Sequence, residues 1–535
     1  MTTTRPNFLF FITDQHRVDH LGCYGNPIVR TPNIDGIAAD GLRFENFYVA
    51  CPICMPNRIV LMTGRMPTVN GSRHNGIPLD LDAVTFVDLL RDAGYRTALI
   101  GKSHLQDMTS HAVPNRIEAK DGLALPPNEL REANRRRRSG PAYEVEIGKL
   151  WMENPDRTVP SPYYGFDFVR FADGHGDQVF GHYSGWLRDR ATDPASLRGW
   201  RNALPAPGLV APQAWRTAVP EELYPTSFVA EETIGYLERH AQTSGGEPFF
   251  LQCSFPDPHH PFTPPGRYFD MYDPAAIPLP KSFHHVDAHE PAFQRELRAA
   301  AAAGKSNASG PPPFALTDET AVRQCIALTY GMITMIDVAI GRVLGKLSAL
   351  GLDRNTVVIF TTDHGDFMGD HGLMLKHGLH YEGVIHVPFI WSDPANPGAG
   401  TTDLLSGTID IGSTVLARAG LAPFHGSQGF DIVGAARMNE RLPRFGMIVE
   451  EDELGVHLGR DEGLRTRTFA TERWQLTLWD GIEDGCLFDR ESDPEQMHNL
   501  WHSEPHRAIK HELVEKMLRE MIRLGDTAPL TERVA

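Results

Sequence analysis

A cysteine followed four residues later by an arginine begins an apolar stretch in the segment CPICMPNRIVLMTGR, residues 51–65. Pro56 suits the first turn of a helix running to about Met62, because its missing N–H leaves no hydrogen bond unmade there. Cys54 then lies at the positive N-terminal end of that helix, which favours a thiolate, an oxyanion or a bound anion. Arg58 lies one turn further along and can reach the same place. For Cys54 taken alone, a buried core cysteine is the alternative interpretation.

Two short polar pairs follow apolar segments at distant places in the chain. Asp14 and Gln15 follow the segment FLFFIT, and Asp363 and His364 end the segment NTVVIFTTDH. Oxygen ligands suit Ca²⁺ or Mg²⁺, whereas an imidazole nitrogen shifts the preference toward Mn²⁺ or Zn²⁺. Together the two pairs can bind one divalent cation. The Asp363-His364 pair alone is more typical of a turn with a capping aspartate.

The elements that would position these residues follow the pattern of an α/β protein. Unbroken apolar segments alternate with helical patterns, which is typical of a mostly parallel sheet covered by helices on both faces. The expected strands are 8–13, 95–101, 248–255 and 355–363, and the expected helices are 85–94 and 320–352. Ligands bind such sheets at the carboxyl ends of the strands. Asp14, Lys102 and Asp363 all follow strand ends, so we expect a site there.

The length of 535 residues exceeds that of one ordinary compact domain. We predict a catalytic α/β domain over residues 1–430. Its insertion at about 105–230 is rich in Pro, Arg and Trp and is expected to cover one edge of the sheet. Short strands and a final helix at 505–523 predict a smaller α+β subdomain over 431–535. Residues 300–315 indicate a flexible connector.

Composition excludes several function classes. The net charge of −17 disfavours general binding to nucleic acid or anionic membranes, so an anionic substrate would need a local cationic pocket. No apolar stretch of about 20 residues predicts a transmembrane span, and the N-terminus lacks the pattern of a secretory signal. The six cysteines are too sparse for a disulfide scaffold, so free thiols in a cytoplasmic protein are expected.

The cysteine segment resembles the signature of the type I, formylglycine-dependent sulfatases of the alkaline phosphatase superfamily. That signature reads C-x-P-S-R, followed by an L-T-G-R element, and here Cys54 to Arg58 is followed by residues 61–65 at the same offset. Asn57 stands where serine is usual, a departure that bears on how efficiently the cysteine is modified. Cys51 does not fit the signature.

Further segments resemble the same family in the same order along nearly the whole chain. They are residues 6–26, 94–105, 254–262, 357–383 and 486–500. Each segment alone is weak evidence for the family, and together they are strong evidence for it. The resemblance implies an alkaline phosphatase-like fold, a large mixed and mostly parallel sheet between helices, with a smaller C-terminal subdomain.

The resemblance also implies the metal centre. Cys54 is expected to be oxidised to formylglycine by a formylglycine-generating enzyme during maturation. The implied metal ligands are Asp14, Gln15, Asp363, His364 and the modified residue at position 54. Ca²⁺ is the family's usual cation. Gln15 and His364 are similar to the ligands of the related phosphonate monoester hydrolases, which makes Mn²⁺ the alternative.

The catalytic residues that the resemblance implies are Arg58, Lys102, His104, His259 and Lys376. Hydrated formylglycine offers one hydroxyl, activated by the metal and Arg58, to attack sulfur. Lys102, Lys376 and His259 hold the sulfate oxygens, and Lys376 or His259 assists the leaving group. His104 is the candidate base that deprotonates the second hydroxyl and releases sulfate. Surface lysines and loop histidines are the ordinary alternatives for these residue types.

Three functions remain open. The leading hypothesis is a sulfuric ester hydrolase, arylsulfatase-like, acting on aryl or other small sulfates, and a homodimer or higher oligomer is expected from the family. The closest alternative is a phosphonate monoester hydrolase or phosphodiesterase with the same site, although Lys102 and His104 match the sulfatase pattern. An unmodified pseudoenzyme that binds metal and anions is the third. His371, His377 and His380 have no assigned role.

Overall fold

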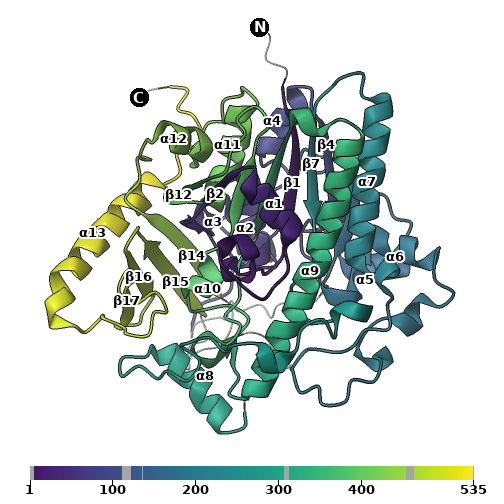
Figure 1. Cartoon of the computed structure of the whole chain (residues 1–535). Coiled ribbons are helices and arrows are strands. Elements are labelled where there is room, and N and C mark those ends of the chain that lie inside the picture. Colours follow the sequence, from purple (N-terminus) through teal and green to yellow (C-terminus); the bar gives the residue numbers. More distant parts are fainter. Residues whose placement is uncertain (1–4, 111–121, 135, 306–312, 454–462, 534–535) are drawn as a thin grey trace.

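A nine-stranded sheet runs through the centre of the molecule in the computed structural model, which describes residues 5–110, 122–134, 136–305, 313–453 and 463–533 (Figure 1). The strand order is β12-β2-β11-β9-β1-β7-β4-β5-β6. The strands are β1 (Asn7–Thr13), β2 (Leu42–Phe44), β4 (Arg96–Gly101), β5 (Phe168–Asp173), β6 (Phe180–Gly181), β7 (Phe249–Ser254), β9 (Thr356–Thr362), β11 (Phe389–Ser392) and β12 (Gly400–Thr402).

The central strands of this sheet are parallel. β1 pairs in parallel with both β7 and β9, and β4 pairs in parallel with β7 and β5. The antiparallel pairs lie toward the flanks, where β11 joins β9 to β2 and β6 ends the sheet beside β5. The predicted mixed, mostly parallel α/β fold is therefore confirmed, and the four strands expected from their apolar runs are β1, β4, β7 and β9.

Two helical layers enclose the sheet. One contains α1 (Pro32–Ala39), α7 (Pro225–Thr243) and α9 (Glu319–Ala349), and the other contains α2 (Cys54–Thr63), α4 (Phe86–Asp92) and α11 (Ile411–Arg418). Alternate residues of β1 point into the two cores: Phe8 and Phe10 pack on the α2 side, and Leu9 and Phe11 on the α9 side. This alternation is the two-residue period of a strand buried on both faces.

Helix α9 is long and apolar enough to cross a membrane by length and composition alone. However, 83% of its most apolar stretch is buried inside the protein. It lies beside α7 against the sheet (Figure 1), so its apolar surface is core surface. The helix predicted over 320–352 is this buried element.

The region predicted to be an insertion contributes to the main sheet. β5 and β6 form its last two strands, and α5 (Gly148–Glu153) and α6 (His182–Arg188) lie beside them. Part of the predicted connector is helical, since α8 (Ala292–Ala302) extends into it, and residues 306–312 lie outside the described residues. The remaining short elements are α3 (Pro67–Asn70), α10 (Glu382–Ile385), α12 (Ile432–Met438), and the strand pairs β3 (Phe47–Tyr48) with β13 (Ser406–Gly407) and β8 (Phe314–Ala315) with β10 (Leu373–Met374).

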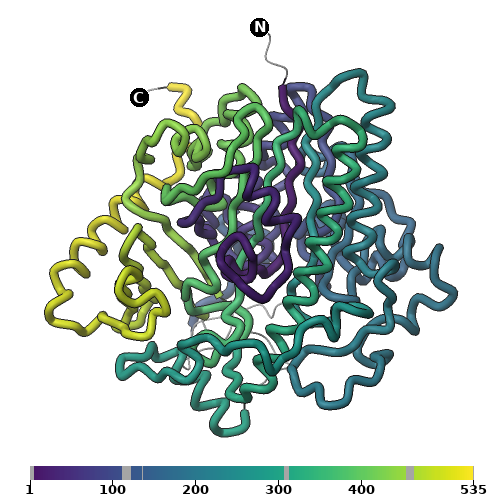
Figure 2. The backbone as a smooth tube through the Cα atoms, viewed as in Figure 1, coloured from purple at the N-terminus to yellow at the C-terminus, as the bar shows by residue number. Residues whose placement is uncertain are grey.

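The C-terminal part is a four-stranded antiparallel sheet with one long helix. Its strands are β14 (Met447–Glu453), β15 (Leu464–Ala470), β16 (Trp474–Trp479) and β17 (Gly485–Asp489), and α13 (Arg507–Arg523) packs on it. Figure 2 shows this yellow end of the chain running along the flank of the larger part. Ile448 and Val449 belong to the same hydrophobic cluster as Met55 and Ile59 of α2, so the core around the helix that carries Cys54 continues into the C-terminal sheet.

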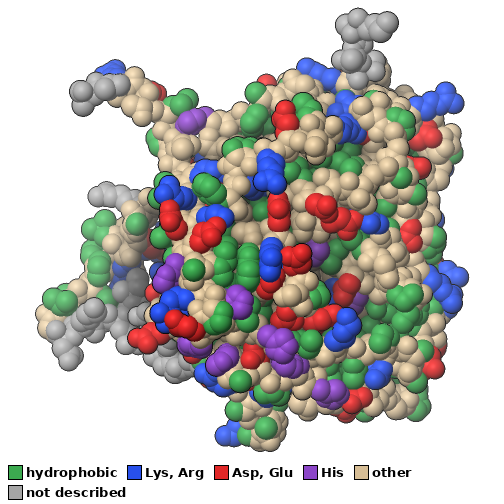
Figure 3. Space-filling view, turned by 60° about the vertical axis from the view of Figure 1, so that its left-hand side comes forward, with side chains coloured by type: hydrophobic (Ala, Val, Ile, Leu, Met, Phe, Trp, Pro, Cys, Tyr) green, Lys and Arg blue, Asp and Glu red, His purple; other side chains and the backbone are tan. Residues whose placement is uncertain are grey.

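Acidic and basic side chains are interspersed on the face drawn in Figure 3, with several histidines among them. This mixture agrees with the net charge of −17, and it places no broad field of one sign on that face. An anion that binds on this face would therefore depend on a local group of lysine and arginine side chains.

Candidate active site

Cys54 is the first residue of α2, as the sequence predicts. The chain enters from an extended Ile53, and Pro56 lies in the first turn, where its missing N–H leaves no hydrogen bond unmade. Gly64 ends the helix in the left-handed conformation, at φ 61°. The whole helix is buried, and Cys54 itself is 2% exposed. The sulfur therefore lies at a helix N-terminus inside the protein.

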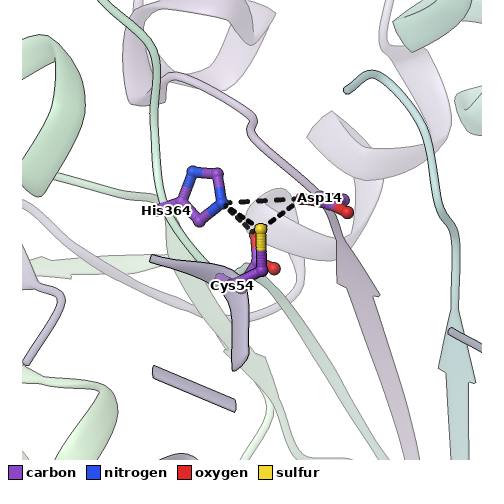
Figure 4. A group of neighbouring side chains, drawn as sticks. Asp14, Cys54 and His364 are labelled. Atoms are coloured by element: carbon purple, nitrogen blue, oxygen red, sulfur yellow. Dashed lines mark hydrogen bonds and ion pairs between the residues drawn. The ribbon is translucent and has the colours of Figure 1, made fainter. Parts of the chain in front are cut away.

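Three of four neighbouring strands are followed directly by polar side chains that lie at this helix end. In the order β9-β1-β7-β4, the four strands are parallel, so their carboxyl ends meet at one edge. Asp363 follows β9, Asp14 follows β1 and Lys102 follows β4. Figure 4 shows Asp14, Cys54 and His364 directed toward one another from these separate elements. The predicted clustering at the strand ends is thus present.

The predicted metal ligands form a compact buried group. One ligand atom from each of Asp14, Cys54, Asp363 and His364 lies within 4.8 Å of the others. The Nδ1 of His364 lies 2.9 Å from the carbonyl oxygen of Gly365, to which it can donate, and this fixes the ring with Nε2 facing Cys54 Sγ at 3.0 Å. Such a backbone partner is the usual support of a metal-binding histidine. Two carboxylates and one imidazole nitrogen therefore fit a single divalent cation.

Gln15 completes this group through its amide. Its backbone adopts φ 60°, uncommon for a residue other than glycine. The Nε2 donates to Asp366, which leaves Oε1 as an oxygen facing the site, 3.1 Å from Lys376 Nζ. Asp366 is fully buried and also accepts two backbone N–H groups, from Met368 and Leu375. The amide is therefore held with its oxygen toward the other ligands.

Three cationic side chains surround the sulfur. Lys376 Nζ lies 3.0 Å from Cys54 Sγ, and Lys102 Nζ forms an ion pair with Asp14. The Nε of Arg58 donates to Asp363 at 2.8 Å, while its Nη1 donates to Ser254 Oγ at 3.0 Å. Arg58 Nη2 is buried and has no hydrogen-bond partner among the described residues. An anion placed here would meet two ammonium groups and one unused guanidinium N–H.

The charges shift the pKa values of the acids. Burial raises the pKa of Asp14, but Lys102 and Arg58 outweigh burial and hold it below the ordinary value, so the carboxylate stays ionised. Burial likewise raises the pKa of the Cys54 thiol, and Lys376 and Lys102 bring it down to about 7. The site is built to hold negative charge at the position of Cys54 Sγ.

The predicted histidines lie at different places in the site. His259 Nε2 is 3.3 Å from Lys376 Nζ, so the two residues predicted to act on the leaving group are in contact. His104 is buried with φ 56°, and its Nδ1 has no hydrogen-bond partner among the described residues. Burial holds the pKa of His104 well below the ordinary value, with Lys102 and Arg58 adding to the effect. The His104 ring is therefore neutral.

Asn57, at the position where serine is usual, is fully buried and forms a bridge. Its Oδ1 accepts from Thr408 Oγ1 at 2.8 Å and from the N–H of Ala50 at 3.1 Å, while its Nδ2 donates to the carbonyl oxygen of Asp363. The asparagine therefore ties α2 to the strand end that carries Asp363 and His364. A serine side chain is too short to span these partners.

Sequence reasoning missed His175, which lies in the predicted insertion. Its Nε2 is 2.9 Å from Lys102 Nζ and 3.7 Å from Asp14 Oδ2, and its ring stacks on His259 at 3.7 Å between centroids. The side chain is 26% exposed, whereas Asp14 and Lys102 are inaccessible. A histidine between two glycines just after β5 was the available signal, because β5 is parallel to β4 and ends at the same edge.

We expect His175→Ala to lower kcat/KM by about 10- to 100-fold, because Lys102 loses a buried polar partner and His259 loses the ring that orients it. Steady-state kinetics on an aryl sulfate, the substrate class that the resemblance implies, would measure this loss. His284→Ala, an exposed histidine far along the chain, is the control and should behave as wild type. Equal kinetics for His175→Ala and wild type would remove His175 from the site.

The fold and site together define an alkaline phosphatase-like protein. Its buried lysine and arginine side chains and its candidate metal ligands converge on a cysteine at the N-terminus of a helix. The family model described as Sulfatase matches residues 6–421, so the chain belongs to the sulfatase family. Membership of this family supports the hydrolysis of sulfate esters as the class of reaction.

Known proteins resemble this chain over nearly its full length. An arylsulfatase of Clostridium perfringens is 28% identical, with 94% of this chain and 92% of the relative aligned. A multifunctional alkaline phosphatase superfamily protein, PehA of Trinickia caryophylli, is 26% identical over 96% and 95% of the two chains. The crystal structure of a phosphonate monoester hydrolase of Agrobacterium radiobacter superposes with a TM-score of 0.75 at 24% identity, covering 99% and 98%. The last likeness establishes the fold alone.

Proposed function

We propose that this protein hydrolyses small sulfate monoesters, aryl sulfates among them, with Cys54 converted to formylglycine and one divalent cation bound beside it. The observation that carries the proposal is the position of Cys54 Sγ, buried at a helix N-terminus, 3.0 Å from both Lys376 Nζ and His364 Nε2. A nucleophile at this point meets positive charge on several sides, where a sulfate group would lie.

The cation would be held by Asp14, Gln15, Asp363, His364 and the modified residue at position 54. When bound, it supplies positive charge that makes a hydroxyl more acidic and offsets the charge of the sulfate oxygens. Formylglycine, when hydrated, supplies two hydroxyls on one carbon. The carboxylates favour Ca²⁺ and the imidazole favours Mn²⁺, so we propose Ca²⁺ with Mn²⁺ as the alternative.

The remaining residues hold the substrate and move protons. Lys102 and Lys376 bind sulfate oxygens, and Arg58 has a buried N–H for the same group. Lys376 donates a proton to the leaving oxygen, and His259 beside it at 3.3 Å keeps that ammonium group oriented. We assign to His104 the role of the base that takes a proton from the residue at position 54, because its buried Nδ1 has no hydrogen-bond partner among the described residues, and loss of that proton allows sulfate to leave.

A phosphonate monoester or phosphodiester hydrolase is the second candidate. Gln15 and His364 support it, and a phosphonate monoester has anionic oxygens similar to those of a sulfate ester. The phosphonate monoester hydrolase of Agrobacterium radiobacter shares the fold. Lys102 and His104, two residues apart directly after β4, favour the sulfatase instead. A low phosphonate activity from the same site is compatible with the proposal.

Relative kcat/KM for matched aryl esters would decide between the two. We expect the aryl sulfate to be preferred over the aryl phosphonate monoester by at least about 10-fold, a difference of about 1.4 kcal/mol in transition-state binding. Both esters should carry the same phenol, so that the leaving group is constant. A preference for the phosphonate would assign the second function.

A further inference from the structure

Lys376 is held in a backbone segment of unusual conformation. The residues on either side of it, Leu375 and His377, both have positive φ, at 71° and 98°. Neither is glycine, so each conformation costs free energy and persists only when the surrounding structure holds it. Lys376 is itself 3% exposed, so its Nζ reaches the site along a fixed path.

One carboxylate of the C-terminal sheet holds this segment. Glu451 of β14 lies 3.0 Å from His377 Nδ1 through Oε1, and its Oε2 accepts from the N–H of Gly378 at 3.0 Å. The same Oε2 lies 2.9 Å from Nε2 of His380. The side chain of Glu451 is inaccessible to solvent. Burial raises its pKa, but hydrogen bonds from His377 and His380 outweigh this and keep it below the ordinary value.

Two further strands of the same sheet contact the segment. Thr468 of β15 lies with Oγ1 2.8 Å from His380 Nδ1, and Trp479 of β16 donates from Nε1 to the carbonyl oxygen of Gly378 at 2.9 Å. Both ring nitrogens of His380 therefore have partners in the C-terminal sheet. Two of the three histidines that the motifs left without a role, His377 and His380, are thus bound from outside the main sheet.

We propose that Glu451 is a positioning residue that holds Lys376 against Cys54, so that the C-terminal sheet completes the active site. The inference rests on the role proposed for Lys376 above. Lys376 must place Nζ near Cys54 Sγ, His259 and His364 at once, and a displacement of about 1 Å in such a group can cost about 100-fold in rate.

Three substitutions separate positioning from general stability. Glu451→Ala removes all three contacts to the segment. Glu451→Gln can retain them, because the amide oxygen accepts from Gly378 and His380 while the NH₂ faces His377 in its other tautomer. Glu450→Ala is the matched control: it removes a neighbouring buried glutamate of β14, whose Oε2 accepts from the N–H of Thr68 at 3.0 Å, away from Lys376.

The test is a double-mutant cycle of Glu451→Ala with Lys376→Ala, measured as kcat/KM on an aryl sulfate. We expect Glu451→Ala alone to lose about 10- to 100-fold, and Glu451→Gln and Glu450→Ala to remain close to wild type. In the Lys376→Ala background, Glu451→Ala should cost less than about twofold, because the group it positions is gone. Equal losses in both backgrounds would overturn the proposal.

A structural measurement keeps the inference independent of the reaction. A crystal structure of Glu451→Ala should show Lys376 Nζ displaced from residue 54, and an unmoved Nζ would also overturn the proposal. If Glu451→Ala does not fold, Glu451→Asp replaces it in both experiments, since the shorter side chain withdraws the carboxylate. If the wild-type protein hydrolyses no sulfate ester, the proposed function is contradicted. The position of Lys376 Nζ in the Glu451→Ala crystal structure would then still decide whether Glu451 positions Lys376.

Discussion

Replacement of Cys54 by alanine is expected to lower kcat/KM for an aryl sulfate by about 10⁴-fold or more, the usual scale for loss of a nucleophile. Alanine cannot be converted to formylglycine, so no hydroxyl stands at the helix N-terminus to attack sulfur. The surrounding cations remain, so the sulfate ester should still bind with a similar dissociation constant. Steady-state kinetics and equilibrium binding of the same ester to the Cys54→Ala protein would measure both quantities.

Cys51→Ala is the matched control for this substitution. Cys51 is buried three residues earlier, and burial raises the pKa of its thiol well above the ordinary value, with Glu451 adding to the effect. We expect the Cys51→Ala protein to retain wild-type kinetics. If Cys54→Ala retained activity and Cys51→Ala did not, the assignment of the nucleophile would be wrong. If the wild type binds but never turns over sulfate esters, the pseudoenzyme alternative holds.

The second large effect is expected from Asp14. We expect Asp14→Asn to lose bound divalent cation and to lower kcat by about 10³-fold, because several kcal/mol of charge stabilisation at the site are removed. Asp14 is a member of the ligand group and the ion-pair partner of Lys102, with no exposure of either side chain. The amide would leave Lys102 buried beside a neutral group, which adds to the loss.

Metal analysis of the purified protein beside its kinetics measures this effect. Chelation of the wild type should reproduce the loss, and added Ca²⁺ or Mn²⁺ should restore activity to the wild type but not to Asp14→Asn. Asp337→Asn, a buried aspartate that caps α1 through the N–H groups of Asn33 and Ile34, is the control. Full activity of metal-free wild type would show that no cation takes part.

Much of the fold could be predicted because its central strands lie between two helical layers. β1, β7 and β9 are buried on both faces, so the sequence of each is a mostly apolar run. Such a run predicts a buried strand from the sequence alone. Their polar successors, Asp14 and Asp363, then fall at one edge by the geometry of parallel strands. The same logic places Lys102 after β4. These parts of the site needed no knowledge of distant contacts.

The missed residues depend on edge strands and on contacts between distant segments. β5 is only half buried, and its sequence FVRFAD has a charged residue in the middle, so it lacks the apolar pattern of a buried strand. Without a predicted strand before it, His175 could not be assigned to the sheet edge that forms the site. Glu451 belongs to an antiparallel strand about 75 residues from Lys376, and no local spacing connects the two. In the sequence, Asn57 is only a departure from the motif. Its bridging role depends on a contact with Thr408, which lies far away along the chain.

The central claim is the nucleophile at position 54, and the mass of the tryptic peptide Phe44–Arg58, from protein expressed in its native host, tests it most directly. We predict that this peptide carries an aldehyde or its hydrate in place of the Cys54 thiol, while Cys51 in the same peptide remains alkylatable. A peptide in which both cysteines are fully alkylated would contradict the proposal, because an unmodified thiol has no second hydroxyl to release sulfate from the enzyme.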